Sequence, residues 1–352
     1  MSEKKVTFLF GGPGSEREVS VATAKSALPS FDDQFRIQPV FITPDRRWVV
    51  SENYVAPGEA WDVAMRLMTQ SAVPSDIALE TIETSSPDVV FIGLHGEYGE
   101  DGTVQALLEA RGLAYTGSNS EASALAMDKP KVLQILQDED LLVPEFLEVT
   151  PEVTPSDVQA FADFNGYPLV VLPADRGSSV GVTIVKQSED LDSAIEQART
   201  KSDRVMVTKY IAGQEVSCGL LVTDKNELTA LPVTDLNPIE GHDFFDYDAK
   251  YLAGECDEVT PSRLPEDVQT NVQEIARKVH QLLGADGYSR VDMIVTPNHE
   301  VYVLELNTLP GMTQTSIIPQ QAKVHGLSFS ELLATICNNI DRSNEDYLTF
   351  ED

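Results

Sequence analysis

The sequence predicts an α/β and α+β protein with more than one domain. At 352 residues the chain is long enough for two or three domains, and 42% apolar with 7% aromatic residues is ordinary globular composition. Strand-like and helical segments alternate up to about residue 127, which is typical of a doubly wound α/β domain. Further along, two β-branched runs flank Pro297-Asn298, and this pattern predicts a hairpin.

Residues 1–127 are predicted to form the N-terminal α/β domain. Apolar strand-like runs end at glycine-containing turns that open helical segments, as in folds that bind ligands beyond the carboxyl ends of their strands. The predicted strands are 6–10, 37–42 and 88–92, and the predicted helices are 16–28 and 103–109.

Two further domains are predicted, at 128–212 and 213–352. The first has a helix at 129–137, strands at 167–172 and 204–211, and a loop of small residues at 176–181. The second has strands at 215–222, 228–233, 291–295 and 301–306, a long polar loop at 237–255, and helices at 266–283, 316–325 and 328–340. The acidic tail from residue 341 is expected to fray.

The charge and the cysteines restrict the function classes. The net charge of −32 repels phosphate backbones and anionic lipid heads, so no nucleic-acid partner and no membrane partner is expected. An anionic substrate then needs local cations. The three cysteines lack zinc-site spacing and fit a reducing compartment, and no run resembles a signal peptide or a membrane span, so a cytoplasmic protein is expected.

The hairpin carries the most informative residues. Asp292 and Glu305 stand in otherwise core-like strands, and isolated buried carboxylates are too costly to keep without a partner such as a metal. With Asn307 they supply hard oxygen ligands that suit magnesium. Arg290 shares a strand face with Asp292, and the Gly311 N–H after Pro310 can face an anion. The alternative is that these acids occur by chance beside a turn.

Two glycine-rich loops of the N-terminal domain are candidate substrate-binding segments. Glu16, at the start of the helix after the first loop, suits a ligand ammonium, although it can equally be an acid that complements the helix dipole. His95 opens the second loop, which has three glycines and three acids in eight residues; it is either a ligand or orienting group, or a helix cap.

The later domains contain segments typical of a nucleotide site. The loop 177–181 can cradle phosphate oxygens, although such loops are also common linkers. Lys209 and Glu215 can flank a purine and its ribose, while Lys209 alone is more often a strand-edge charge. The aromatic-rich loop 244–251, which contains Lys250, resembles either a lid that excludes water or a loop pinned to the core.

These motifs together resemble the D-alanine–D-alanine ligase family of the ATP-grasp superfamily. The resemblance runs from about residue 6 to 333 and rests on the ordered set at 16–20, 95–102, 127–129, 177–181, 247–251, 290–292 and 305–312. It implies an ATP-grasp fold with the nucleotide between the central and C-terminal domains. It also implies ligation of two D-alanines through an acyl phosphate for peptidoglycan precursors, and a homodimer.

The resemblance implies roles for the amino-acid substrates. Glu16 is expected to bind the ammonium of the first D-alanine, and Ser178 with Tyr251 completes a hydrogen-bonded triad with Glu16. His95 is expected near the first substrate. Ser316 is expected to take the carboxylate of the second substrate.

It also implies the nucleotide contacts. Lys129 and Ser179 are expected to hold ATP phosphates, and Lys250 the γ-phosphate. Lys209 and Glu215 are expected to contact the adenosine.

The remaining roles concern charge developed in the reaction. Arg290 and the Gly311 N–H are expected to form the oxyanion hole. Asp292, Glu305 and Asn307 are expected to bind two magnesium ions, with manganese as an alternative.

Two positions depart from the family pattern. Leu172 stands where relatives have a lysine, a change that weakens ATP binding by about 1.5–3 kcal/mol unless Arg176 or another cation substitutes. Thr208 stands where relatives have an acid, which is a milder change. One alternative function is a D-alanine–D-lactate ligase or a ligase for another D-amino acid, although Tyr251 argues against lactate. Leu172 motivates the other alternative, a non-catalytic ATP-binding paralogue.

Overall fold

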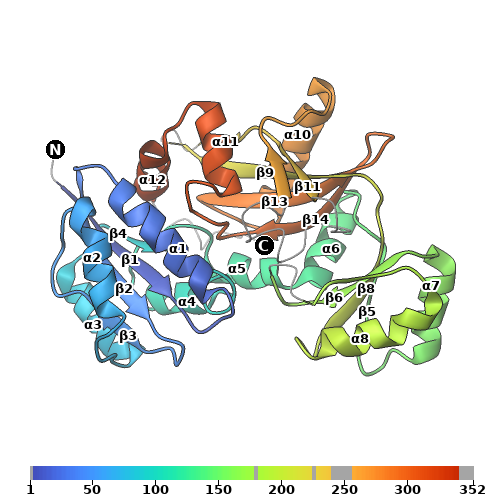
Figure 1. The fold of residues 1–352 in the computed structure, drawn as a ribbon, viewed down its shortest axis with the longest axis horizontal. Helices are drawn as coiled ribbons and strands as arrows, with labels where there is room; N and C mark the ends of the chain where they lie inside the picture. The colour runs from blue at the N-terminus through green and yellow to red at the C-terminus, as the bar shows by residue number, and fades with distance from the viewer. Residues whose placement is uncertain (1–2, 178–180, 224–226, 239–255, 341–352) are drawn as a thin grey trace, which may run out of the picture.

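The computed structural model describes residues 3–177, 181–223, 227–238 and 256–340, which form three β-sheets with flanking helices (Figure 1). Four residues with expected roles lie outside the described residues: Ser178, Ser179, Lys250 and Tyr251. The predicted lid loop and the acidic tail also lie outside them.

The first sheet has the strand order β3-β2-β1-β4. Strands β1 (Lys4–Gly11), β2 (Phe35–Ile42) and β4 (Val89–Ile92) are parallel, and β3 (Trp48–Val50) pairs with β2 in the antiparallel sense. Helices α1 (Arg17–Ala27) and α4 (Thr103–Glu109) confirm the two predicted helices. Helices α2 (Pro57–Leu67) and α3 (Ser75–Ser85) and strand β3 were not predicted.

The second sheet has the order β5-β8-β6-β7 and a core of its own. Its strands are β5 (Phe146–Glu148), β6 (Leu169–Pro173), β7 (Thr183–Val185) and β8 (Val205–Lys209), packed with helices α7 (Pro155–Asn165) and α8 (Leu191–Arg199). A capping box between Thr154 and Asp157 fixes the start of α7 by satisfying backbone N–H groups that the helix itself leaves unpaired. All of its strand pairs are antiparallel.

The third sheet has the order β12-β11-β9-β13-β14, with β10 beside β9. Its strands are β9 (Gln214–Val222), β10 (Leu228–Ala230), β11 (Thr234–Pro238), β12 (Cys256–Val259), β13 (Tyr288–Val295) and β14 (Val301–Asn307). Strands β13 and β14 form the predicted antiparallel hairpin. Two expectations were wrong in detail: the strand predicted at 228–233 ends at Ala230, and the first two residues of the predicted polar loop belong to β11.

Helices connect the three sheets. Helix α5 (Ser120–Met127) leads into α6 (Lys129–Asp138), whose buried Leu133 and Leu136 pack into the core of the third sheet together with α10 (Glu266–Leu282). Helices α11 (Ile317–His325) and α12 (Phe329–Asn338) contribute to the core of the first sheet. The division at residues 127 and 212 stays a prediction, and the packing of α6 shows that cores and chain segments do not coincide.

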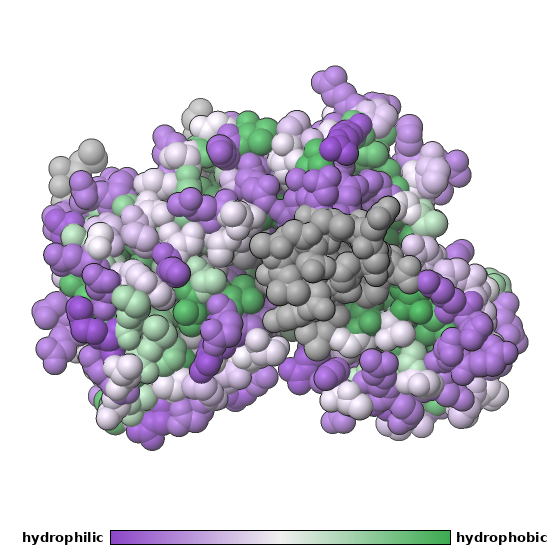
Figure 2. Space-filling view, in the orientation of Figure 1, coloured by the Kyte–Doolittle hydropathy of each residue, from purple (hydrophilic) through white to green (hydrophobic). Residues whose placement is uncertain are grey.

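The outer surface agrees with the charge of the chain. Hydrophilic residues, in purple, are spread over the face seen in Figure 2, with apolar residues in green between them. Within the described ranges, no helix has the length and apolar character needed to cross a bilayer.

Candidate active site

A cleft lies between the second and third sheets. The second sheet contributes Leu172 on β6 and Lys209 on β8, while the third sheet contributes Glu215 on β9 and Asp292 on β13. Lys129, the first residue of α6, also lines the cleft. Both sheets contribute apolar and charged side chains to the lining, and a largely apolar pocket with a few polar groups is typical of a small-molecule site.

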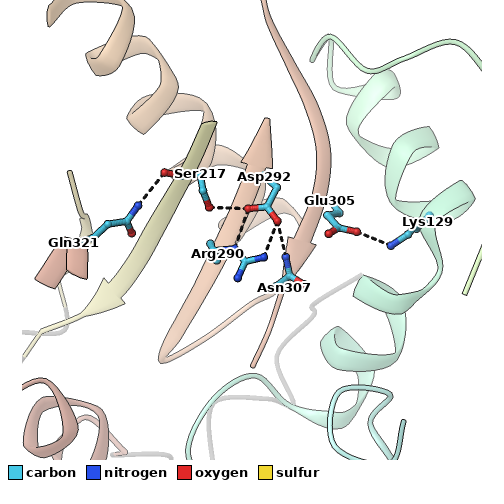
Figure 3. A network of polar contacts seen from close by, with 7 residues as sticks. All are labelled: Lys129, Ser217, Arg290, Asp292, Glu305, Asn307 and Gln321. Atoms are coloured by element: carbon cyan, nitrogen blue, oxygen red, sulfur yellow. Dashed lines mark hydrogen bonds and ion pairs between the residues drawn. The ribbon is translucent and has the colours of Figure 1, made fainter. Parts of the chain in front are cut away.

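The two predicted metal-binding carboxylates stand opposite each other on the hairpin (Figure 3). The antiparallel register pairs Asp292 with Glu305, and Arg290 with Asn307. Alternate residues of a strand share a face, so all four side chains belong to one face of the sheet. The ladder shifts register just after Asp292, where a β-bulge locally re-aims side chains.

Asp292 is 2% exposed, and both of its carboxylate oxygens accept hydrogen bonds. Arg290 donates from Nε to Oδ1 at 2.9 Å and from Nη2 to Oδ2 at 2.7 Å. Ser217 Oγ donates to Oδ1 at 2.6 Å, and Asn307 Nδ2 donates to Oδ2 at 3.1 Å. A buried carboxylate with an arginine fork and two neutral donors is fully compensated, which explains how an acid is kept in this strand.

Glu305 forms an ion pair with Lys129, and both residues line the cleft. Lys129 Nζ lies 2.6 Å from Glu305 Oε2, and both side chains are largely buried. The pair joins α6 to β14, segments 176 residues apart in sequence. It also places a cation beside the carboxylates, where a phosphate group would need one.

The donor set at this point fits a magnesium ion. Two carboxylates and one amide converge on one sheet face, and magnesium is usually held by one or two carboxylates together with substrate phosphates. Among the described residues, no group of three or more His, Cys, Asp or Glu side chains is close enough to hold a metal ion unaided. Asp292, Glu305 and Asn307 would hold the ion, and the metal assignment stays a prediction.

Glu16 lies in a tight corner, directly before helix α1 and close to Gly96 and Gly177. It is 7% exposed, and no side-chain hydrogen bond caps helix α1, although an acid there can still favour the dipole. A β-carbon at Gly96 would stand 2.0 Å from Glu16 Oε2, and one at Gly177 would stand 3.8 Å from the same atom. Glycine at 96 therefore permits the second loop to close on Glu16, and the start of the predicted phosphate flap reaches the same carboxylate.

His95 connects three segments of this corner. Its Nδ1 lies 3.0 Å from the Leu309 carbonyl, and its Nε2 lies 2.8 Å from Thr23 Oγ1. A carbonyl only accepts, so Nδ1 carries the hydrogen. The residue preceding α4 is Gly102, with no side-chain cap, so the helix-capping alternative for His95 was wrong. Its contacts are those of an orienting group.

The loop after β14 brings Gly311 and Ser316 together. A β-carbon at Gly311 would lie 3.0 Å from Ser316 Oγ. Ser316 Oγ accepts from the Thr313 N–H at 3.1 Å and lies 2.8 Å from Thr313 Oγ1. Ser316 precedes α11, and its hydroxyl makes no capping bond with that helix. The predicted oxyanion and second-carboxylate positions are thus neighbours.

The expected adenosine contacts lie on the cleft wall. Lys209 is exposed at the end of β8, which is an inner strand of the second sheet, so the strand-edge alternative does not describe it. Leu172 lines the cleft and packs against the core of the third sheet. Thr208 also lines the cleft. Leu172 therefore adds apolar wall where the family pattern has a charge.

Three supporting residues were missed from the sequence. Gln321 is fully buried on α11, accepts from the Gly219 N–H and donates to the Ser217 carbonyl and to Thr234 Oγ1, each at 2.9 Å. Ser217 holds Asp292, so the two residues tie α11 to the carboxylate (Figure 3). The available signal was a polar residue at an apolar helix position and a serine in a buried strand.

Glu258 on β12 is the third. Burial raises the pKa of its carboxyl, while a hydrogen bond from Gln320 Nε2 at 2.5 Å and the charge of Arg290 act in the opposite direction. Its place on the site side of the sheet had no sequence motif to indicate it.

Comparison with known proteins gives two family matches. The sequence model described as D-ala D-ala ligase N-terminus matches residues 5–118, and the one described as D-ala D-ala ligase C-terminus matches residues 135–338. The chain is 43% identical over 343 residues to the D-alanine–D-alanine ligase of Trichlorobacter lovleyi, covering 96% of this chain and 95% of that protein. It is 39% identical over 335 residues to that of Syntrophobacter fumaroxidans, covering 95% and 97%.

Solved structures agree with the sequence comparison. The VanG D-Ala:D-Ser ligase from Enterococcus faecalis superposes with a TM-score of 0.81 at 30% identity, covering 95% of this chain and 98% of that one. The D-alanine–D-alanine ligase from Bacillus anthracis complexed with ATP superposes with a TM-score of 0.71 at 28% identity, covering 95% of each chain. The ATP-grasp fold prediction is confirmed.

Proposed function

This chain belongs to the D-alanine–D-alanine ligase family, and we propose that it joins two D-alanine molecules while converting ATP to ADP and phosphate, in cell-wall precursor synthesis. The observation that carries the proposal is the cleft between the second and third sheets, in which the Asp292–Glu305 carboxylate pair meets Lys129. Phosphoryl transfer depends on positioning and charge neutralisation, and this wall offers both.

In the first step, a carboxylate oxygen of the first D-alanine attacks the γ-phosphorus of ATP, forming an acyl phosphate and releasing ADP. We assign the ammonium of this substrate to Glu16. The closeness of Gly96 and Gly177 to Glu16 supports the assignment, since Gly177 directly precedes the residues expected to hold phosphate. Lys129 is assigned to the phosphates because it lines the cleft beside the carboxylates.

In the second step, the amine of the second D-alanine attacks the acyl carbon and expels phosphate. The oxygen that becomes negatively charged needs donors, and we assign Arg290 and the Gly311 N–H to it. Arg290 is oriented by its two bonds to Asp292, and Gly311 lies beside Ser316, the residue assigned to the second carboxylate.

The metal is part of the proposal. When bound, magnesium or manganese would neutralise the negative charge that develops on ADP, the leaving group of the first step. Asp292, Glu305 and Asn307 are the residues assigned to hold it. Lys129 would then exchange its contact with Glu305 for a phosphate oxygen.

The alternative functions differ in the identity of the second substrate. The similarity to a D-Ala:D-Ser ligase favours a ligase with another D-amino acid as a specific alternative. The homodimer and the cytoplasmic location also remain proposals, based on the family resemblance and on the cysteines.

A substrate panel tests the proposed function. Purified protein with ATP, magnesium and D-alanine is assayed for ADP, and the products are identified by mass, with L-alanine as the matched control. Equimolar D-alanine with D-serine or D-lactate then compares second substrates. D-alanyl-D-alanine as the main product supports the proposal; a mixed product as the main species contradicts it, and ADP that forms equally without amino acid contradicts ligation.

A further inference from the structure

Arg176 stands at the mouth of the nucleotide cleft without a role in the proposed chemistry. It lines the cleft and follows β6 by three residues, directly before Gly177. Its side chain is 44% exposed, and its Nη1 lies 3.5 Å from Glu97 Oε2. Glu97 belongs to the second glycine-rich loop, so the ion pair spans from the second sheet to the first.

The charge balance of the cleft gives Arg176 its importance. Of the residues lining it, Lys129, Lys209 and Arg176 are cations, while Glu215, Asp292 and Glu305 are acids. The wall is therefore formally neutral in a chain of charge −32. A nucleotide polyphosphate brings several negative charges into this space, so every available cation matters.

Lys129 and Arg176 differ in how firmly an ion pair holds each of them. Lys129 is paired with Glu305 at 2.6 Å and is largely buried. Arg176 has a longer contact to a carboxylate that is shared, because Arg46 Nη2 lies 2.7 Å from the other oxygen of Glu97. An exposed ion pair of this kind contributes little, so its guanidinium can turn toward a ligand at small cost.

The position of Arg176 indicates which part of the nucleotide it meets. A β-carbon on the neighbouring Gly177 would lie 3.8 Å from Glu16 Oε2, which places Arg176 at the end of the cleft nearest the first amino acid. The phosphate that is transferred has to reach this end. The planar guanidinium also matches phosphate oxygens in a two-point contact that lysine cannot make.

We infer that Arg176 is a further nucleotide-binding residue. Its guanidinium breaks the ion pair with Glu97 and contacts the terminal phosphates of ATP. The inference rests on the proposed function and adds a specific residue to its ATP site. It also provides a cation in a cleft where Leu172 presents a hydrocarbon side chain.

Nucleotide affinity is the direct test. The dissociation constant of the non-hydrolysable β,γ-imido analogue of ATP, with magnesium, is measured by calorimetry for the wild type and for Arg176→Gln. We expect the variant to bind about tenfold more weakly, the lower end for a lost charge-assisted contact. Adenosine, which has no phosphate, should bind both proteins equally, and the affinity of the variant for the analogue should respond less to salt.

Two matched variants separate the alternatives. Arg199→Gln removes an arginine of nearly equal exposure, 45%, from helix α8, where it pairs with Glu196, and should leave affinity unchanged. Glu97→Gln breaks the ion pair but keeps the cation, and should not weaken binding. If Arg176→Gln binds within about twofold of wild type, or if Glu97→Gln weakens binding equally, the inference is wrong. Absence of analogue binding by the wild type would instead overturn the proposed function itself.

Discussion

Replacing Gly96 with alanine should damage the first amino-acid site selectively. Gly96 has φ of +63°, and a β-carbon there would lie 2.0 Å from Glu16 Oε2 and 3.0 Å from Glu16 Cδ. A carbon and an oxygen that are not bonded cannot stand 2.0 Å apart, so the carboxylate has to move. Two costs then combine: the left-handed backbone costs about 1–2 kcal/mol for a side-chain residue, and Glu16 leaves its place.

The second cost is the one that affects function. A charge-assisted hydrogen bond between Glu16 and an ammonium is worth about 1.5–3 kcal/mol, so its loss corresponds to roughly a 10- to 150-fold weaker first D-alanine. Glu16 is not among the residues that line the ATP cleft, so the KM for ATP should change little. The matched control is Gly112→Ala, because Gly112 has the same φ of +63° and no atom within 4 Å of the added carbon.

The assay is D-alanine-dependent ADP release over a wide D-alanine range, which separates the first and second substrate sites, together with urea unfolding of both variants. We expect both variants to lose similar backbone stability and only Gly96→Ala to show the raised KM of the first D-alanine. Equal kinetics for Gly96→Ala and Gly112→Ala would refute the placement of Glu16 at the first substrate.

Three other perturbations have defined outcomes. Asp292→Asn removes the carboxylate that orients Arg290 and should lower kcat by about 10²–10³-fold in the ADP-release assay, with an unchanged circular dichroism spectrum; activity near wild type would contradict its role. Gln321→Leu strands the Gly219 N–H and should lower the free energy of unfolding by about 3 kcal/mol in urea, whereas a change below about 0.5 kcal/mol would contradict the hydrogen-bond account. Burial lowers the pKa of His280 from 6.5 to about 4, so the unfolded chain binds this proton first as pH falls. Stability due to the neutral imidazole is complete above about pH 6.5 and is lost toward about pH 4, by roughly 3 kcal/mol; pH-dependent urea unfolding should show a shallower loss in His280→Gln, and parallel curves would contradict this assignment.

Local patterns in the sequence were sufficient for the hairpin and its carboxylates. Asp292 and Glu305 interrupt continuous apolar runs, and the Pro297-Asn298 turn marks their strands as neighbours, so the antiparallel hairpin was predictable. Its register, which is shifted after Asp292, was not predicted. The helix at 103–109 was predicted with its observed bounds because Gly102 and the apolar spacing mark its start.

Other parts depend on tertiary contacts that no local pattern contains. The pairing of Lys129 with Glu305 requires α6 to pack on the third sheet, whose strands are far from it in sequence. Helix α8 was missed because its apolar residues, chiefly small alanines beside Leu191 and Ile195, give a modest signal between polar stretches. Gln321 was missed because a polar residue at an apolar helix position is only a weak signal, and its three partners come from distant segments.

The central claim is that the acyl group is activated by transfer of phosphate to the carboxylate of the first D-alanine, and oxygen labelling tests it most directly. D-alanine with both carboxylate oxygens replaced by ¹⁸O is incubated with the protein, magnesium and ATP, and the phosphate and dipeptide are analysed by mass spectrometry. The account predicts phosphate that carries one ¹⁸O atom, formed together with D-alanyl-D-alanine and ADP in equal amounts. Dipeptide accompanied by unlabelled phosphate, or ADP formed without dipeptide, would contradict it.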